Sequence, residues 1–332
     1  MAGETDRRVV QPTSSAITWA NRWDHFLARW AFDRGGHRVA PGLYALGKPT
    51  ADSPVFVSAN YALSFDALRE ALAGRDSYIL VLDTKGINVW CAAGKGTFGT
   101  DELVQRIEET GLKDVVRHRT LILPQLGAPG VAAHQVTKRT QFKIEYGPVR
   151  AADLPEYLKT HQATPEMRRV RFTLRDRLVL IPVELVPVLP VLIAVVGLDL
   201  IGGFVSSPPV VAAILTGTVL FPILLPWLPT HAFSTKGLIL GGFVALPFAL
   251  LAFLSGPNSA LWLRATGALT WLLTLPPITA FIALNFTGST TFTSRTGVRR
   301  EIFAYIPVMA WMFGGGIALT IARAAIKMLG GT

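Results

Sequence analysis

From residue 178 to residue 332 the chain is overwhelmingly apolar and carries very few charges. Five stretches of this half have the length that crosses a bilayer as a helix, because about 20 apolar residues span the hydrocarbon core. They lie at 178–197, 210–229, 237–254, 260–284 and 303–322. Since an α-helix satisfies its own backbone hydrogen bonds in lipid, the sequence predicts an all-α, polytopic transmembrane domain of about five helices.

The first of these stretches contains proline and a carboxylate. Pro182, Pro187 and Pro190 predict a kinked helix, because proline removes a backbone donor and clashes with the preceding turn. A carboxylate such as Glu184 is energetically costly to bury in lipid. We expect it either to be functional or, as the alternative, to pair with a neighbouring helix or be protonated.

Basic residues predict the orientation of the apolar half. Five arginines precede the first stretch: Arg168, Arg169, Arg171, Arg175 and Arg177. Lys236, Arg299 and Arg300 fall on the same side after alternate crossings, whereas the connection at 198–209 has no basic residue. Basic loops remain on the cytoplasmic side. We therefore expect a protein of the cytoplasmic membrane, with the N-terminal domain in the cytoplasm and, after five crossings, the C-terminus outside.

The first half of the chain has a mixed polar and apolar composition and holds nearly all the acidic residues. We expect a cytoplasmic α/β domain over residues 1–165, a basic juxtamembrane linker over 166–177 and the transmembrane domain over 178–332. The net charge of +10 at pH 7 would suit nucleic acid. The basic residues gather at the membrane flanks, however, and no nucleic-acid-binding motif is present. Membrane lipid is therefore the expected partner, and nucleic acid is not.

Strand-like and helix-like segments alternate through the first half. Apolar runs near 54–58, 77–83, 119–123 and 142–146 predict strands, and the segments between them predict helices. One helix should open with Thr100 and Asp101 as a side-chain-capped turn, and others should cover 131–138 and 154–158. This alternation predicts a mostly parallel, Rossmann-like sheet.

A separate helix is expected from Ser14 to about Phe32. Trp19, Trp23 and Trp30 recur at helical spacing, with Arg22 elsewhere on the surface. We expect its apolar face to dock on the domain or on a membrane surface.

Four loops should meet at the carboxyl edge of the parallel sheet, where α/β folds bind ligands. They are 58–61, 84–95, 125–131 and 146–149, and their glycines and prolines let backbone approach a flat ligand closely. Ordinary turn chemistry explains any one loop alone, but four on one rim predict a binding site. The candidate binding residues of these loops, outside the cysteine segment, are Ser58, Asn60, Tyr61, Thr84, Gln125, Gly127, Ala128, Pro129, Gly130, Val131, Tyr146 and Gly147.

The only cysteine of the 332 residues, Cys91, lies in the second loop. One cysteine excludes an internal disulfide and any multi-cysteine metal site, including an iron–sulfur cluster. Asn88 is a good N-cap for a short helix over 89–93 that Gly94 should end. Cys91 would then lie at the third helical position, where the helix dipole favours a thiolate. The alternative interpretation is a buried small hydrophobe.

Two nucleotide-binding motifs can be set aside. Gly94-Lys95-Gly96-Thr97 is similar to the end of a P-loop, but the required upstream glycine is Val89, and Gly96 stands at the Ser/Thr position. No Gly-x-Gly-x-x-Gly segment follows a predicted strand either.

The segment Asn88-Val89-Trp90-Cys91-Ala92-Ala93-Gly94-Lys95 resembles the cap-helix motif of corrinoid proteins related to the corrinoid iron–sulfur protein. Most closely, the chain resembles the membrane-bound corrinoid proteins of microbial mercury methylation (the HgcA family). The resemblance extends over residues 57–61 and 123–131. It implies a base-off, cobalamin-type corrinoid on the rim of the sheet, capped by residues 88–95. Its implied contacts in that segment are Asn88, Val89, Trp90, Cys91, Ala92, Gly94 and Lys95.

The resemblance implies that the Cys91 thiolate is the lower axial ligand of cobalt and that Asn88 orients the helix that carries it. The histidine signature Asp-x-His-x-x-Gly of other corrinoid proteins is absent. The implied activity is that of a corrinoid-dependent methyltransferase, which moves a methyl group from cobalt to Hg(II) and gives methylmercury. A soft anionic donor opposite the methyl group favours its departure as a carbanion or radical equivalent, which Hg(II) accepts.

The implied partners are a ferredoxin with two iron–sulfur clusters, as electron donor and possible source of Hg(II), and a methyl-tetrahydrofolate methyltransferase. Two other functions stay open. One is a corrinoid methyl carrier of one-carbon metabolism, as in the acetyl-CoA pathway. The other is a non-enzymatic membrane transporter or sensor with a cytoplasmic ligand domain.

Overall fold

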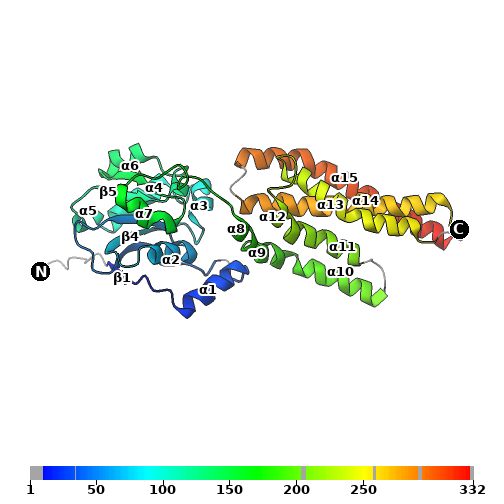
Figure 1. The fold of residues 1–332 in the computed structure, drawn as a ribbon, viewed down its shortest axis with the longest axis horizontal. Coiled ribbons are helices and arrows are strands. Elements are labelled where there is room, and N and C mark those ends of the chain that lie inside the picture. Colours follow the sequence, from blue (N-terminus) through cyan, green and yellow to red (C-terminus); the bar gives the residue numbers. More distant parts are fainter. Residues whose placement is uncertain (1–9, 34, 203–206, 257–258, 291–293, 330–332) are drawn as a thin grey trace, which may run out of the picture. The chain divides into compact units, whose positions relative to one another are not determined.

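The computed structural model describes residues 10–33, 35–202, 207–256, 259–290 and 294–329. The chain divides into two compact units, Met1–Arg171 and Phe172–Thr332 (Figure 1). The division falls within the segment 166–177, where the sequence predicts a linker. Each unit is described by itself.

The N-terminal unit is built on one six-stranded sheet. Its strands are β1 (Gln11–Thr13), β2 (Gly42–Leu46), β3 (Val55–Ala59), β4 (Ser77–Leu82), β5 (Thr120–Leu123) and β6 (Lys143–Tyr146), in the order β1-β2-β4-β3-β5-β6. The four strands from β3 to β6 are mutually parallel, which confirms the predicted parallel sheet, whereas β2 pairs antiparallel with β4.

The sequence does not predict β1 and β2. The β2 segment, Gly42–Leu46, includes a glycine and an alanine, which have low strand propensity. Its register against β4, with Leu43 opposite Leu80, buries Leu43 in the core. Tertiary pairing therefore forms this strand, where local preference would not.

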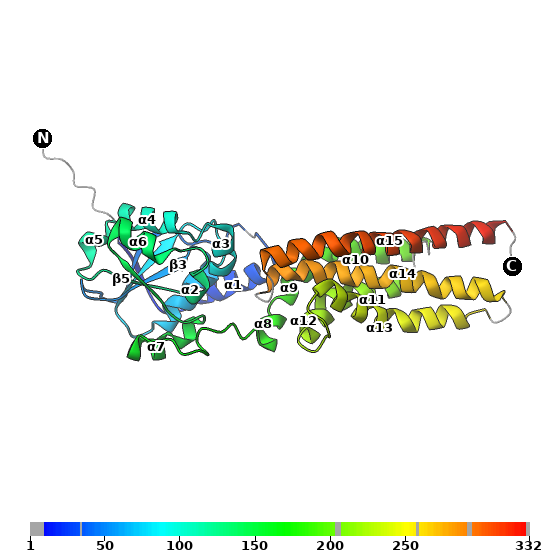
Figure 2. The ribbon, with the colours of Figure 1, turned by 90° about the horizontal axis from the view of Figure 1, so that it is seen from above.

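Helices cover both faces of the sheet, as the two views show (Figures 1 and 2). They are α2 (Ala62–Ala71), α3 (Val89–Lys95), α4 (Thr100–Glu109), α5 (Leu112–Val115), α6 (Ala133–Thr140) and α7 (Leu154–Thr160), with α1 (Trp19–Arg29) at the side of α2. Neighbouring residues of β3 enter opposite cores, because side chains alternate along a strand. Val57 packs with α3, α4 and α6, and Phe56 packs with α2 and α7.

The start of α4 differs from the prediction in one detail. Its N-cap is Gly99, which has no side chain to cap the helix, so the side-chain cap expected from Thr100 and Asp101 is wrong. The Thr100 hydroxyl instead accepts a hydrogen bond from the backbone N–H of Ala132 at 2.8 Å. The Thr100 hydroxyl therefore bonds to a neighbouring loop, although the local sequence predicts that it caps the helix.

The C-terminal unit is helical. Its elements are α8 (Leu174–Leu178), α9 (Ile181–Leu185), η3 (Val186–Val188), α10 (Leu189–Gly202), α11 (Ser207–Leu215), η4 (Thr216–Leu220), α12 (Phe221–Leu224), α13 (Phe233–Leu254), α14 (Leu261–Asn285), η5 (Phe286–Ser289) and α15 (Arg295–Met328). Five helical runs within the described residues are long and apolar enough to cross a membrane: Leu174–Gly202, Ser207–Leu224, Phe233–Leu254, Leu261–Ser289 and Thr296–Ile326.

Packing in this unit centres on α14, which lies against both α13 and α15 (Figure 2). The first run is divided into α9, a 3₁₀ turn and α10 around Pro182, Pro187 and Pro190, as the prolines predict. Glu184 is paired, because its carboxylate accepts a hydrogen bond from the hydroxyl of Ser289.

Candidate functional site

The carboxyl edge of the parallel strands brings four connections together. The strand order reverses between β3 and β5, and ligands of α/β sheets bind at such a switch point. Residues 60–61 follow β3, 83–88 follow β4, 124–132 follow β5 and 147–149 follow β6. The four predicted loops therefore do emerge from one edge.

The helix α3 holds Cys91 in the second of these connections. The side-chain oxygen of Asn88 accepts a hydrogen bond from the Cys91 backbone N–H at 2.9 Å, which confirms Asn88 as the N-cap. The last residue of the helix is Lys95, and its C-cap is Gly96, whose φ of +85° is the left-handed conformation that glycine allows. The helix is therefore two residues longer than predicted, because Gly96 and not Gly94 ends it.

One face of α3 is buried and the other is open. Val89, Ala92 and Ala93 pack in the core beneath the sheet edge. Trp90 and Cys91 are half-buried, and Gly94 and Lys95 are exposed. Cys91 therefore lies at the margin between core and solvent, where a ligand can reach its sulfur.

The pKa of the Cys91 thiol shifts in the direction opposite to the one expected. Burial raises the pKa of the Cys91 thiol, and this effect outweighs the positive charge of Lys95 and the Asn88 side chain, which lower it. The sequence predicts a thiolate favoured by the helix terminus. The shift is opposite to the expected one, because loss of hydration on burial disfavours the charged form.

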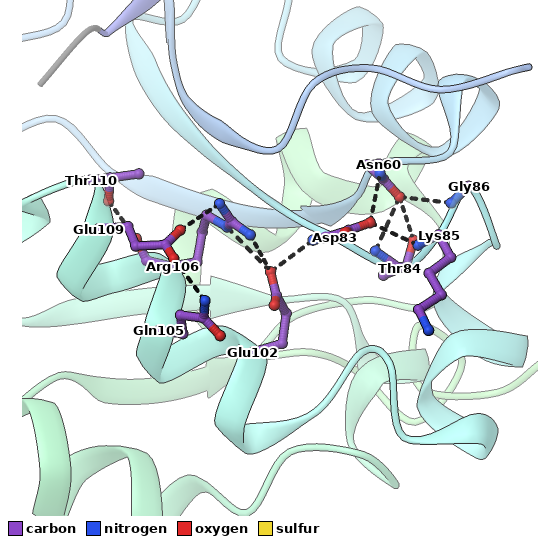
Figure 3. Close-up of polar contacts among 10 residues, drawn as sticks. All are labelled: Asn60, Asp83, Thr84, Lys85, Gly86, Glu102, Gln105, Arg106, Glu109 and Thr110. Carbon is purple, nitrogen blue, oxygen red and sulfur yellow. Dashed lines mark hydrogen bonds and ion pairs between the residues drawn. The ribbon is translucent and has the colours of Figure 1, made fainter.

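The loop before α3 is held by Asn60 (Figure 3). The Asn60 side-chain oxygen accepts hydrogen bonds from the Thr84 N–H at 3.0 Å, the Thr84 hydroxyl at 2.8 Å and the Gly86 N–H at 2.9 Å. Its amide nitrogen donates to Asp83 at 3.1 Å. Asn60 and Thr84 are buried and bonded to each other, so they position the loop and do not face a ligand.

A second contact holds the same loop from α4. The Glu102 carboxylate accepts a hydrogen bond from the Asp83 N–H at 2.8 Å, and Arg106 pairs with Glu102 at 2.8 Å (Figure 3). Sequence reasoning missed both residues. Their spacing of four indicates a helical ion pair, but nothing local indicates that Glu102 reaches the end of β4.

The connection after β5 packs directly on α3. A Cβ atom on Gly130 would lie 2.1 Å from the carbonyl oxygen of Phe98 and 3.0 Å from the Cα of Ala93. A Cβ on Gly127 would lie 2.5 Å from the Phe98 ring, which is fully buried. The sequence does not predict the role of Phe98, because its two glycine neighbours come from a distant part of the chain.

Two polar groups complete this side of the rim. The Tyr146 hydroxyl donates to the Val131 carbonyl at 2.6 Å and so ties β6 to the connection after β5. The side-chain oxygen Oε1 of Gln125 is buried and has no hydrogen-bond partner among the residues that the structure describes. A buried acceptor without a donor is costly, so a ligand that supplies an N–H there would be stabilised.

The other predicted residues divide into two groups. Ala128 and Pro129 lie near α3, where Ala128 is half-buried and Pro129 is exposed. Three others have structural contacts instead. Ser58 is buried inside β3, Tyr61 is the N-cap of α2, and Gly147 packs against Ile122 of β5.

The donor set around Cys91 is sparse. In the part of the chain that the structure describes, no group of three or more His, Cys, Asp or Glu side chains could hold a metal ion. A metal bound to Cys91 would therefore have to bring most of its own ligands.

A cavity of about 550 Å³ lies at the opposite edge of the sheet. It is lined by residues at the amino ends of β3 and β5, including Val55 and Thr120, and by His118 and His161. It is therefore separate from the rim around α3.

Comparison with known proteins gives a family match that lies within this domain. Residues 33–158 match the family of the CO dehydrogenase/acetyl-CoA synthase delta subunit. The chain is 34% identical over 128 residues to the acetyl-CoA decarbonylase/synthase complex subunit gamma of Methanopyrus kandleri, and 32% identical over 124 residues to that of Archaeoglobus fulgidus. The subunit of Methanocaldococcus jannaschii is 38% identical over 93 residues.

These matches cover limited parts of both proteins. They take in 38%, 37% and 27% of this chain and 27%, 26% and 19% of the respective relatives. The chain thus matches about a quarter of the length of the first two. The α/β domain is similar to these subunits, whose names refer to acetyl-CoA synthesis. The expected identity as a mercury-methylation protein receives no support from them.

Proposed function

We propose that the chain is a membrane-anchored, corrinoid-dependent methyl-transfer protein whose N-terminal domain binds the corrinoid over α3. One observation carries the proposal. Cys91 lies in the first turn of a helix capped by Asn88, half-buried at the rim where the connections after β3, β4, β5 and β6 meet. The match of residues 33–158 to the CO dehydrogenase/acetyl-CoA synthase family supports it.

The residues present fit a corrinoid in three respects. A single soft donor, Cys91, would suit a metal that brings most of its ligands with it. The open side of α3 at Gly94, where a Cβ would meet nothing within 4 Å, leaves room for a flat ring. The unpaired Oε1 of Gln125 can accept a hydrogen bond from an amide on the ring edge.

The chain's own residues then have distinct roles. When bound, the corrinoid supplies the cobalt ion that carries the methyl group. Cys91 would supply the sulfur that holds the metal, and its thiol would lose its proton there, because a metal ligand must be deprotonated and burial raises the pKa of this thiol. Asn88 fixes the turn that carries this sulfur. Trp90 and Lys95 lie beside Cys91 on α3 and would contact the bound group.

The similarity to acetyl-CoA decarbonylase/synthase subunits favours a methyl carrier of one-carbon metabolism. In this function a methyl-tetrahydrofolate methyltransferase supplies the methyl group. A ferredoxin with two iron–sulfur clusters supplies electrons, because this chain has only one cysteine and cannot hold a cluster.

Hg(II) methylation is the second candidate, and the cysteine itself favours it. A thiolate ligand would donate electron density to the bound metal, which would suit an acceptor that takes the methyl group as a carbanion or radical equivalent. The five apolar helical runs also agree with the membrane-bound corrinoid proteins that the sequence resembles. We propose that these runs anchor the protein in the cytoplasmic membrane with the α/β domain on the cytoplasmic side.

Optical spectroscopy of the full-length protein in detergent tests corrinoid binding through Cys91, which both candidate functions require. Loaded with hydroxocobalamin, the protein should give a thiolate-to-cobalt spectrum that Cys91→Ala abolishes and Cys91→His replaces by an imidazole-type spectrum. Ser58→Ala, inside β3, is the matched control and should keep the spectrum. A folded wild-type protein that binds no cobalamin would refute corrinoid binding.

The acceptor is tested on the methylated protein. Incubation with Hg(II) and, separately, with a thiol or a nickel-containing acetyl-CoA synthase should reveal which acceptor removes the methyl group. Methylmercury formation that depends on Cys91 would establish the second candidate and displace the first.

A further inference from the structure

The short helix α1 presents aromatic side chains to solvent. Trp19 is 85% exposed and Trp23 is 62% exposed, and Phe26 and Phe32 are also exposed. The rings of Trp23 and Phe26 stack with centroids 5.2 Å apart, and Phe26 contacts Trp30 at 5.8 Å. Residues 19, 23, 26 and 30 recur at intervals of three and four, so they form one stripe along the helix. Contiguous exposed apolar surface of this kind marks an interaction site.

The opposite, polar face of α1 is the one attached to the domain. His25 contacts Asp66 of α2 at 2.8 Å, and Asp24 contacts the buried His37 at 2.7 Å. Asn21 accepts a hydrogen bond from Arg69 of α2 at 3.1 Å. The apolar face of this helix therefore does not dock on the domain, which is one of the two surfaces that the sequence predicts for it; the membrane surface stays a prediction.

This inverted attachment has a physical consequence. An amphipathic helix that only closed a core would bury its aromatic face and leave its polar face in water. Here buried polar contacts with Asp66 and Arg69, which are 3% and 6% exposed, hold the aromatic stripe outward. The fold thus keeps the stripe available to a second surface.

Charge and composition identify that surface. Arg22 and Arg29, seven residues apart, are exposed along one border of the stripe, and the first turn of α1 has no acidic residue. Tryptophan is the residue most typical of the membrane–water interface, and basic residues beside it attract anionic headgroups. The same chain carries five apolar runs of spanning length, so a bilayer is the apolar surface available to the domain.

We propose that α1 is an interfacial helix that inserts Trp19, Trp23 and Phe26 into the headgroup region of an anionic bilayer. Arg22 and Arg29 contact lipid phosphates beside it. The helix thereby fixes how the α/β domain faces the membrane, independently of the linker between the two units. The inference rests on the proposed membrane anchoring and goes beyond it, because anchoring alone requires no contact between α1 and lipid.

Photocrosslinking in the full-length protein tests this. The photoreactive amino acid p-benzoylphenylalanine would replace Trp23 in protein reconstituted into vesicles of phosphatidylglycerol and phosphatidylcholine. Mass spectrometry of the tryptic peptides should find lipid adducts at position 23, in lower yield in vesicles of phosphatidylcholine alone. Replacement of an aromatic side chain that is already exposed leaves the fold intact.

Two matched positions separate the possible results. Glu108 is exposed on α4, and the same amino acid there should give no lipid adduct. Trp311 is 82% exposed within the run Thr296–Ile326, and substitution there should give adducts in both kinds of vesicle. Lipid adducts at 311 but not at 23 would overturn the interfacial helix and leave the anchoring intact. Absence of adducts at both positions would overturn the anchoring itself.

Crosslinks from position 23 to residues 172–329 of the same chain, or to a second copy, would show that protein covers the stripe. Either result would overturn the proposal. Equal lipid adducts at positions 23 and 108 would do the same, because they would show contact without selectivity.

Discussion

The side-chain oxygen of Asn60 accepts hydrogen bonds from both the backbone N–H and the hydroxyl of Thr84, at 3.0 and 2.8 Å. Asn60 follows β3 and Thr84 follows β4, so this contact joins the carboxyl ends of two neighbouring strands. The Thr84 hydroxyl oxygen also lies 2.7 Å from the Ile87 carbonyl oxygen, one residue before the N-cap of α3, so its single proton is shared between the Asn60 and Ile87 acceptors. The place of Cys91 therefore depends on a side chain 31 positions earlier in the sequence.

Removal of that side chain should loosen the loop. Asn60→Ala leaves the Thr84 and Gly86 donors without their acceptor, and each unsatisfied buried group costs about 1–3 kcal/mol. We expect a free energy of unfolding lower by about 2–5 kcal/mol, and faster trypsin cleavage after Lys85. Thermal unfolding and limited proteolysis in detergent measure these effects. Gln105→Ala, on the exposed side of α4, is the control, and equal cleavage of the two variants would contradict this role of Asn60.

Two glycines of the rim should respond in opposite ways to the same substitution. Gly130→Ala places a Cβ 2.1 Å from the Phe98 carbonyl oxygen, so it should destabilise the domain and separate the connection after β5 from α3. Gly94→Ala meets nothing within 4 Å and should stabilise α3 by up to about 1 kcal/mol, because alanine has the higher helix propensity.

The same Gly94→Ala change should weaken corrinoid binding if the ring lies over the open side of α3. Thermal unfolding and cobalamin titration of both variants separate stability from binding. Unchanged cobalamin affinity in Gly94→Ala would place the ring elsewhere on the rim.

The raised pKa of Cys91 predicts slow alkylation of the ligand-free protein. Because the reactive form is the thiolate, the rate with iodoacetamide at pH 8 should fall below that of an exposed cysteine. The rate should keep rising with pH beyond about 8.5, the ordinary thiol pKa. Lys95→Gln removes a charge that lowers this pKa, so it should shift the profile to still higher pH. A profile centred below pH 8 would contradict the dominance of burial.

The contact between α1 and α2 depends on a buried ion pair. Asp66→Asn leaves the buried Arg69 guanidinium without its carboxylate, 2.7 Å away, and loss of one partner of a buried pair costs about 3–5 kcal/mol. We expect faster hydrogen exchange of α1 measured by mass spectrometry on the full-length protein. Asp52→Asn is the matched control, because the Asp52–Arg117 pair is exposed and its loss should leave exchange unchanged. Protection of α1 in Asp66→Asn equal to that of the wild type would show that other contacts hold the helix.

Local patterns predict much of the architecture for physical reasons that act within a short segment. Apolar runs such as Tyr78–Leu82 fill a strand buried on both faces, and Asn88 caps α3 through a hydrogen bond only three residues long. Long apolar runs give the five helical runs of spanning length, because their composition alone decides that property. The β2 strand could not be found in this way, since its pairing partner lies about 35 residues away.

By itself the sequence determined that one half of this chain is apolar and helical and that the other half alternates strand with helix. It also determined that the single cysteine lies in a capped turn between a strand and a helix of the alternating half. These properties depend on neighbours in the chain. Tertiary structure alone decided that Asn60 and Thr84 hold the loop instead of facing a ligand, that burial raises the pKa of the Cys91 thiol, and that α1 turns its aromatic stripe outward. The reason is that burial and hydrogen bonding depend on which distant segments approach one another, and local sequence does not specify that approach.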